Sequence, residues 1–229
     1  MRPKGSPRPT EAPTETEVAI PLPDGGFLGA SLAIPKASRR CILFAHGSGS
    51  SRFSPRNRHV AGVLNDAGMA TLLLDLLTAE EEAIDARTAE FRFDIPLLAA
   101  RLALATDWAR REPATRRHAF GYFGASTGAA AALVAAASRP DGVGAVVSRG
   151  GRPDLAGESL ERVTAPTLLI VGGRDEAVIE MNREALARLT GAAARLEIVP
   201  GATHLFPEPG ALETVARLAA GWFAEHLVG

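Results

Sequence analysis

Short, unbroken apolar runs alternate with longer segments of helical spacing through most of this 229-residue chain. A strand that is buried on both faces of a sheet needs such a run, because neither side of it meets water. Buried strands that alternate with helices are typical of an α/β fold with a parallel sheet. Six runs follow this pattern, at residues 41–45, 71–76, 119–123, 144–147, 167–171 and 196–199.

Two further β-like runs, at residues 17–22 and 27–34, precede these six. They are separated by Pro-Asp-Gly-Gly at residues 23–26, a turn sequence that favours a hairpin. With this N-terminal β-hairpin included, the chain predicts a mostly parallel sheet of about eight strands with helices on both faces. The segments with the clearest helical spacing are 54–68, 95–109, 128–137 and 212–227.

Two segments fall outside this alternation. Residues 78–93 lack a clear period and contain three consecutive glutamates at positions 80–82, so we expect an irregular segment that covers one edge of the sheet, with the glutamates solvated. Residues 1–14 are rich in proline, threonine and glutamate and hold almost no large apolar side chains, which predicts a disordered lead-in. Residues 15–229 then form a single domain, a length that α/β domains commonly reach.

Charge and composition exclude several classes of protein. The formal charge of −1, from 25 basic and 26 acidic residues, gives no general attraction to nucleic acid or to an anionic membrane. A single cysteine, Cys41, excludes an internal disulfide framework. The longest apolar stretches have about ten residues, roughly half a membrane span. We therefore expect a cytoplasmic protein with no nucleic acid or membrane partner; its oligomeric state stays open.

Residues 124–128 read Gly-Ala-Ser-Thr-Gly and lie between an apolar run and an alanine-rich helical segment. A serine on so sharp a strand-to-helix turn has strained backbone geometry, and its hydroxyl points away from the sheet. Side chains two positions before or after it would collide, which explains the two glycines. The helix N-terminus behind Ser126 also offers free N–H groups to an oxyanion. The motif predicts a nucleophilic serine; the alternative is an ordinary helix N-cap.

A nucleophilic serine requires a base, and the base requires an acid that orients it. Asp175 follows the run at 167–171, and His204 follows the run at 196–199. Because the carboxyl ends of parallel strands meet at one edge of a sheet, we expect Ser126, Asp175 and His204 to lie together there. Asp175 has the alternative role of a helix cap. Other candidates are Asp141 and Asp154 for the acid, and His46, His59, His118 and His226 for the base.

These motifs resemble those of the α/β-hydrolase superfamily and, within it, of the branch related to dienelactone hydrolase. The resemblance extends from about residue 16 to the end of the chain. Its matching segments are Phe-Ala-His-Gly-Ser-Gly at 44–49, Gly-Ala-Ser-Thr-Gly at 124–128, Gly-Gly-Arg-Asp-Glu at 172–176 and Pro-Gly-Ala-Thr-His at 200–204. One position differs, because dienelactone hydrolases proper carry cysteine at the elbow and this chain carries Ser126.

The resemblance implies an α/β-hydrolase fold with Ser126 as nucleophile, His204 as base and Asp175 as orienting acid. It also implies an oxyanion hole formed by the backbone N–H groups of Ser48 and Thr127. Such an enzyme uses no metal and no organic cofactor. We therefore expect a carboxylic-ester hydrolase that acts on small acyl esters, thioesters or lactones. The serine at the elbow favours general ester chemistry over dienelactone itself.

Three arginines are candidates for substrate binding: Arg52, Arg149 and Arg152. Arg149 and Arg152 follow the run at 144–147, and a guanidinium at that edge can bind a substrate carboxylate with two parallel hydrogen bonds. The alternative is a structural ion pair with the glutamates at 80–82 or with Asp154. Arg52 is also expected to anchor the loop that carries Ser48.

Other functions remain open at this stage. A peptidase or an acyltransferase would use the same three residues, and a binding protein of this fold would keep them without turnover. A nicotinamide oxidoreductase would instead use the glycine-rich segment 47–52, with Asp75 as the ribose-binding acid. That segment has Arg52 where the dinucleotide fingerprint has its third glycine.

Overall fold

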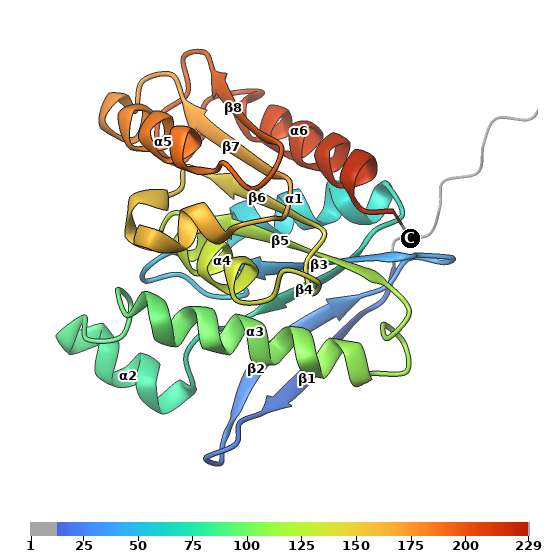
Figure 1. Cartoon of the computed structure of the whole chain (residues 1–229). Coiled ribbons are helices and arrows are strands. Elements are labelled where there is room, and N and C mark those ends of the chain that lie inside the picture. Colours follow the sequence, from blue (N-terminus) through green and yellow to red (C-terminus); the bar gives the residue numbers. More distant parts are fainter. Residues whose placement is uncertain (1–12, 229) are drawn as a thin grey trace, which may run out of the picture.

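The chain folds around one sheet of eight strands, as the apolar runs predict (Figure 1). The computed structural model describes residues 13–228. The strands lie in the order β1-β2-β4-β3-β5-β6-β7-β8; β2 is antiparallel to both its neighbours, and all other pairs are parallel. The strands are β1 (Glu15–Pro21), β2 (Phe27–Ala33), β3 (Arg40–Ala45), β4 (Ala70–Leu74), β5 (Ala119–Ala125), β6 (Ala145–Arg149), β7 (Thr167–Gly172) and β8 (Ala194–Val199).

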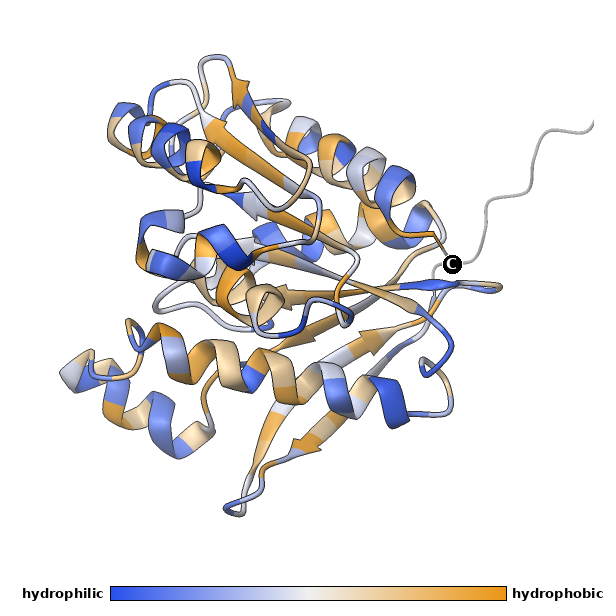
Figure 2. Cartoon of the chain, viewed as in Figure 1, coloured by the Kyte–Doolittle hydropathy of each residue, from blue (hydrophilic) through white to orange (hydrophobic). Residues whose placement is uncertain are grey.

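Helices cover both faces of this sheet, which confirms the α/β-hydrolase architecture. One face carries α3 (Ile95–Arg111), α4 (Thr127–Ala137), the 3-10 helix η1 (Pro153–Arg162) and α5 (Glu176–Arg188), which lie in front of the sheet in Figure 1. The other face carries α1 (Pro55–Asp66) and α6 (Ala211–His226). Figure 2 shows mainly apolar strands, and helices of which most carry both polar and apolar residues.

Residues 78–93 contain a helix, α2 (Ala79–Thr88), so the expectation of an irregular segment is wrong. The hydroxyl of Thr78 accepts from the N–H of Glu81, and the Glu81 carboxylate accepts from the N–H of Thr78 at 2.8 Å. This reciprocal cap is encoded by Thr-x-x-Glu. Only Asp85 is buried on α2, so no apolar stripe marks the helix in the sequence. Glu81 also pairs with Arg101, so the three glutamates are not uniformly solvated.

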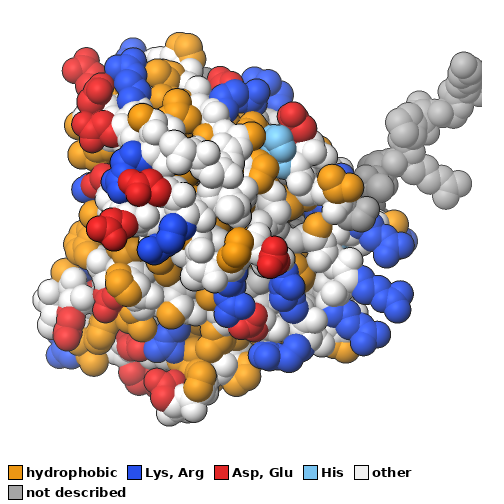
Figure 3. Space-filling view, in the orientation of Figure 1, with side chains coloured by type: hydrophobic (Ala, Val, Ile, Leu, Met, Phe, Trp, Pro, Cys, Tyr) orange, Lys and Arg blue, Asp and Glu red, His pale blue; other side chains and the backbone are white. Residues whose placement is uncertain are grey.

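The ends of the chain are described only in part. Residues 1–12, most of the lead-in predicted at 1–14, lie outside the described residues, and β1 begins at Glu15. No helix within residues 13–228 is long and apolar enough to cross a membrane. The face seen in Figure 3 mixes basic and acidic side chains.

One buried polar pair ties α3 to the central strand β5. The hydroxyl groups of Tyr122 and Thr106 lie 2.7 Å apart, and both residues are fully buried. The Thr106 hydroxyl also donates to the Leu102 carbonyl. Burial raises the pKa of Tyr122 to about 12, so this phenol stays protonated at neutral pH. The pair therefore positions the strand that leads into the Gly-x-Ser-x-Gly turn.

We expect Thr106→Val to lower the free energy of unfolding by about 1–3 kcal/mol, because it leaves the buried Tyr122 hydroxyl without its partner. Adding Tyr122→Phe should restore part of that loss, since both polar groups are then gone. Urea denaturation measures both. Thr88→Val is the control: Thr88 also bonds the carbonyl four residues earlier but is exposed, so its change should stay within about 0.5 kcal/mol. Equal effects of the two Thr→Val changes would contradict this role.

Candidate active site

The sharp turn after β5 has the geometry that the sequence predicts. Ser126 has φ 51° and ψ −121°, a left-handed backbone conformation that is strained for any residue with a side chain. A Cβ at Gly124 would lie 2.4 Å from Ala129 Cα, and a Cβ at Gly128 would lie 2.3 Å from the Ala45 carbonyl oxygen. Both glycines are therefore required by the close packing of α4 on β5 and β3.

Ser126 occupies the N-cap position of α4, yet its side chain makes no capping hydrogen bond. Its hydroxyl thus does not serve the ordinary function of an N-cap serine. The residue is only half-buried, and its backbone N–H donates to the Arg149 carbonyl. The conformation keeps the Ser126 hydroxyl free for another partner.

Asp175 and His204, which follow β7 and β8, lie in direct contact. His204 Nδ1 is 2.6 Å from Asp175 Oδ2. Asp175 begins α5 but makes no side-chain cap there. The other face of the imidazole meets Gly150, where an added Cβ would lie 3.5 Å from the ring. In the tautomer that donates Nδ1–H to the carboxylate, His204 Nε2 is the nitrogen that can accept a proton.

The structure brings Ser126, Asp175 and His204 to one edge of the sheet but does not link all three. No hydrogen bond joins Ser126 to His204 within residues 13–228. Such contacts are often long in the absence of substrate and tighten when it binds. The reserve residues lie elsewhere or have other partners: Asp141 precedes β6 at the opposite edge, and Asp154 binds Arg152 at 2.7 Å.

The loop after β3 approaches the elbow closely. A Cβ at Gly47 would lie 3.0 Å from Ser126 Cβ, and the hydroxyls of Ser48 and Thr127 are 3.0 Å apart. In the part of the chain that the structure describes, the backbone N–H groups of Ser48 and Thr127 have no acceptor. Free backbone N–H groups near a serine hydroxyl are the kind of donor that a tetrahedral oxyanion requires.

His46 holds this loop in place. Its Nε2 accepts from the N–H of Leu76 at 3.1 Å, and its Nδ1 lies 3.0 Å from the Gly47 carbonyl oxygen. Burial lowers the pKa of His46, and both ring nitrogens are already used by the backbone. This histidine therefore connects the loop after β3 to the end of β4 and is not available as a base.

A second support, which the sequence analysis missed, is the pair Asp85–Arg92. The Asp85 carboxylate is 1% exposed and accepts from the N–H groups of Phe91 and Arg92 and from Arg92 Nε, at 2.7–2.9 Å. The Arg92 carbonyl in turn lies 3.5 Å from the Ser48 hydroxyl. The feature that marks this pair is the burial of Asp85 on a helix whose other residues are not buried. Burial of this kind cannot be read from the sequence.

The three arginines proposed for substrate binding differ in surroundings. Arg149 is 5% exposed; its Nη2 donates to Asn57 at 3.4 Å, and its Nε has no acceptor among residues 13–228. Burial, together with nearby Arg56, lowers the pKa of Arg149 to about 10. Arg152 forms two hydrogen bonds with Asp154, at 2.9 and 2.7 Å. Arg149 thus has no acidic partner, whereas Arg152 does.

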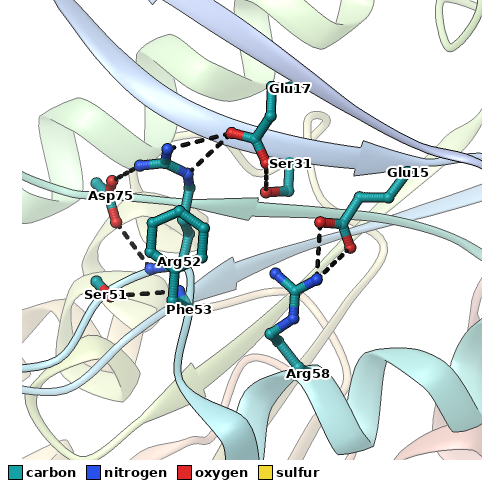
Figure 4. Close-up of polar contacts among 8 residues, drawn as sticks. All are labelled: Glu15, Glu17, Ser31, Ser51, Arg52, Phe53, Arg58 and Asp75. Atoms are coloured by element: carbon teal, nitrogen blue, oxygen red, sulfur yellow. Dashed lines mark hydrogen bonds and ion pairs between the residues drawn. The ribbon is translucent and has the colours of Figure 1, made fainter.

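Arg52 belongs to an ion-pair cluster at the end of β4 (Figure 4). Its backbone N–H donates to Asp75 Oδ1 at 2.7 Å, its Nη1 pairs with Asp75 Oδ2, and its Nη2 lies 3.1 Å from Glu17. Asp75, the ribose-binding acid of the dinucleotide alternative, is therefore already paired. Among residues 13–228, no group of three or more His, Cys, Asp and Glu could hold a metal ion.

A family model and a solved structure both relate this chain to dienelactone hydrolase. Residues 29–223 match the dienelactone hydrolase family. A crystal structure of dienelactone hydrolase from Anabaena variabilis is 58% identical, has a TM-score of 0.93, and the match covers 95% of this chain and 100% of that chain. Est1E from Butyrivibrio proteoclasticus shares the fold at 19% identity and a TM-score of 0.75, with 91% of this chain and 98% of that chain covered.

The curated relatives are longer. Proteins from two strains of Mycobacterium tuberculosis, each named a candidate phosphoribosyl transferase, are 58% identical over 212 residues. The match covers 93% of this chain but 46% of each relative. The chain thus spans about half the length of the curated relatives that it matches.

We expect Gly128→Ala to destabilise the fold by about 3 kcal/mol or more, because the new methyl group meets the backbone oxygens of Ala45 and His46. Gly62→Ala is the matched control: a Cβ at this exposed position of α1 meets nothing within 4 Å, and the change should stabilise by about 0.5–1 kcal/mol. Thermal and urea unfolding measure both. A neutral Gly128→Ala would contradict the close packing of the turn.

We also expect the contribution of Asp85 to depend on pH. Burial raises the pKa of Asp85, but hydrogen bonds from the N–H groups of Arg92 and Phe91 and the Arg92 guanidinium outweigh it and hold the pKa below the ordinary value. A lowered folded-state pKa adds stability above the unfolded value of about 3.9, and that stability is lost as pH falls through the folded value.

Asp85→Asn should therefore destabilise the protein at pH 7 by about 2–4 kcal/mol and by clearly less at pH 3, in urea denaturation at both values. Asp66→Asn, at an exposed position of α1, should change stability by less than about 0.5 kcal/mol at either pH. A gap between wild type and Asp85→Asn that grows on acidification would refute this assignment.

Proposed function

The chain belongs to the dienelactone hydrolase family, and on this premise we propose that it is a serine hydrolase that cleaves carboxylic esters through an acyl-Ser126 intermediate. One observation carries the proposal. Ser126 has a strained backbone and an uncapped hydroxyl at the same sheet edge as the His204–Asp175 pair, whose atoms lie 2.6 Å apart. This combination serves nucleophilic catalysis and has no use in a purely structural turn.

The proposed reaction has two stages. In the first, Ser126 Oγ attacks the ester carbonyl while His204 Nε2 takes the hydroxyl proton; His204 then returns that proton to the departing alcohol. In the second, His204 takes a proton from water, the hydroxide attacks the acyl group, and the proton returns to Ser126 as the carboxylic acid leaves. Asp175 holds the imidazole in the required tautomer and stabilises the imidazolium.

The backbone N–H groups of Ser48 and Thr127 would bind the oxyanion that forms in each stage. Removing one such donor in comparable enzymes lowers the rate by about 10²–10³. His46 and the Asp85–Arg92 pair act through the loop that carries Ser48, so we regard them as positioning residues. Their hydrogen bonds connect that loop to the end of β4 and to the segment after α2.

The substrates that we propose are small acyl esters, with thioesters and lactones as related candidates. The connection from β6 to β7 holds only η1, and the connection from β4 to α3 holds only α2, so a large lid does not cover the site within residues 13–228. The family is named for a lactone substrate, but a serine at the elbow suits ordinary esters. A peptidase, an acyltransferase or a binding protein would use the same residues.

The transferase named for the curated relatives is not our proposal for this chain. That name describes proteins of which the chain matches 46%. The residues that we assign to hydrolysis all lie within the segment that matches the dienelactone hydrolase family, residues 29–223.

Ser126→Ala should abolish hydrolysis of p-nitrophenyl acetate and butyrate, with a loss of about 10⁴-fold or more in kcat, because no other group can form the acyl-enzyme. A fluorophosphonate should label wild type and leave Ser126→Ala unlabelled. Turnover or labelling that survives in the variant would exclude Ser126 as the nucleophile. A wild type that is neither active nor labelled would favour the non-catalytic binding protein.

A further inference from the structure

A cavity of about 400 Å³ opens beside the proposed active site, between the β1–β2 hairpin, the loop after β3 and the start of α2. Among residues 13–228, its walls include neither Ser126 nor Asp175 nor His204. It shares His46, Leu77 and Glu82 with a narrower space that extends along Ser48 and Thr127. Its volume lies within the range of about 300–1,000 Å³ that is typical of small-molecule sites.

Within the described part of the chain, residues 13–228, Arg52 is the one guanidinium in the wall of this cavity, and its charge is already neutralised. The Arg52 side chain packs against Gly29, where an added Cβ would lie 2.6 Å from Arg52 Nη1. Figure 4 shows how its guanidinium lies between Asp75 and Glu17: Nη1 faces Asp75, and Nε and Nη2 face Glu17 at 3.2 and 3.1 Å. Two carboxylates on one guanidinium leave an excess negative charge and no free edge for an anion.

Two further carboxylates in the wall have no counter-charge. Glu80 and Glu82 line the cavity from the first turn of α2, and neither side chain forms an ion pair or a hydrogen bond among residues 13–228. Glu81 between them is different, since it caps Thr78 and pairs with Arg101. His46 adds no positive charge at neutral pH, because burial lowers its pKa.

The lining of the cavity also includes an aromatic residue. Phe27, at the start of β2, is 60% exposed although it is a large apolar side chain, and it lines the same cavity. An aromatic ring and carboxylates around one space suit a group that is both apolar and positively charged, because a cation is attracted to both. An alkylammonium meets this description; a carboxylate or a phosphate does not.

We propose that this cavity is a substrate subsite for an alkylammonium group, so that the preferred esters carry a positive charge in their alcohol or their acyl part. The proposal rests on the proposed ester hydrolysis for its role in turnover. Binding of an ammonium ion to the cavity does not depend on it. The two statements can therefore be tested apart.

The first test compares esters that differ only in charge. Acetylcholine and its neutral isostere 3,3-dimethylbutyl acetate place the group in the alcohol; the ethyl esters of trimethylammonioacetate and of 3,3-dimethylbutanoate place it in the acyl part. Because an ammonium group also activates a nearby ester carbonyl, each kcat/KM ratio is divided by the ratio of the alkaline hydrolysis rates of the same two esters. We expect the corrected ratio to favour the cationic ester of at least one pair by about tenfold, the size that two exposed charge pairs provide. Ratios near one in both pairs would overturn the proposal.

The second test assigns the effect to the cavity. In the Glu80→Gln/Glu82→Gln variant the preference should fall to nearly one, because the kcat/KM of the cationic ester falls more than that of its neutral isostere. The control Glu90→Gln removes an exposed carboxylate just beyond α2 that does not line the cavity, and it should keep the preference. A preference that survives in the double variant, or one that Glu90→Gln removes equally, would reject the assignment.

A titration with choline separates this proposal from the proposed function. Isothermal calorimetry on Ser126→Ala should show saturable choline binding that weakens about tenfold in the added Glu80→Gln/Glu82→Gln background. 3,3-Dimethylbutanol, the neutral isostere, should bind more weakly than choline. Binding without hydrolysis of any ester would support the subsite and refute the ester chemistry. Hydrolysis of neutral esters without choline binding would support the ester chemistry and refute the subsite.

Discussion

The close approach of α4 to the strands beneath it is the constraint on which the site depends. No side chain fits at Gly124 or Gly128, because a Cβ there would overlap backbone atoms within 2.4 Å. That contact forces the turn at Ser126 into a conformation with positive φ. The same contact brings the N-terminus of α4 against the loop after β3. One packing requirement thus sets the position of the serine and of the N–H groups around it.

Buried polar side chains hold the loops at this edge through hydrogen bonds to the backbone. His46 connects two loops through its two ring nitrogens, and the Asp85 carboxylate accepts hydrogen bonds from two backbone N–H groups and a guanidinium. Each would be costly to bury without these partners. Their satisfaction makes the loops rigid, and a rigid arrangement of dipoles is what stabilises a developing charge without reorganisation.

Much of this architecture could be predicted from the sequence because its signals are local. Six strands follow apolar runs, the two hairpin strands follow β-like runs on either side of a turn, and the contact between Asp175 and His204 follows from two strand ends meeting at one edge. Helix α2 was missed, because only a capping pair marks it and it buries no apolar stripe. The Asp85–Arg92 pair joins residues only seven positions apart, but no periodicity marks the turn after α2 that brings them together. The cavity depends on side chains from segments far apart in the chain, whose placement no local pattern encodes.

The antiparallel direction of β2 determines where the β1–β2 turn lies relative to the candidate active site. Because β2 runs against β4, the β1–β2 turn and Phe27 lie at the same edge as the ends of the parallel strands. This turn lies before residue 29, where the match to the family begins. Under the subsite that we propose, substitutions in the hairpin would alter selectivity and leave unchanged the strands that lead to Ser126, Asp175 and His204.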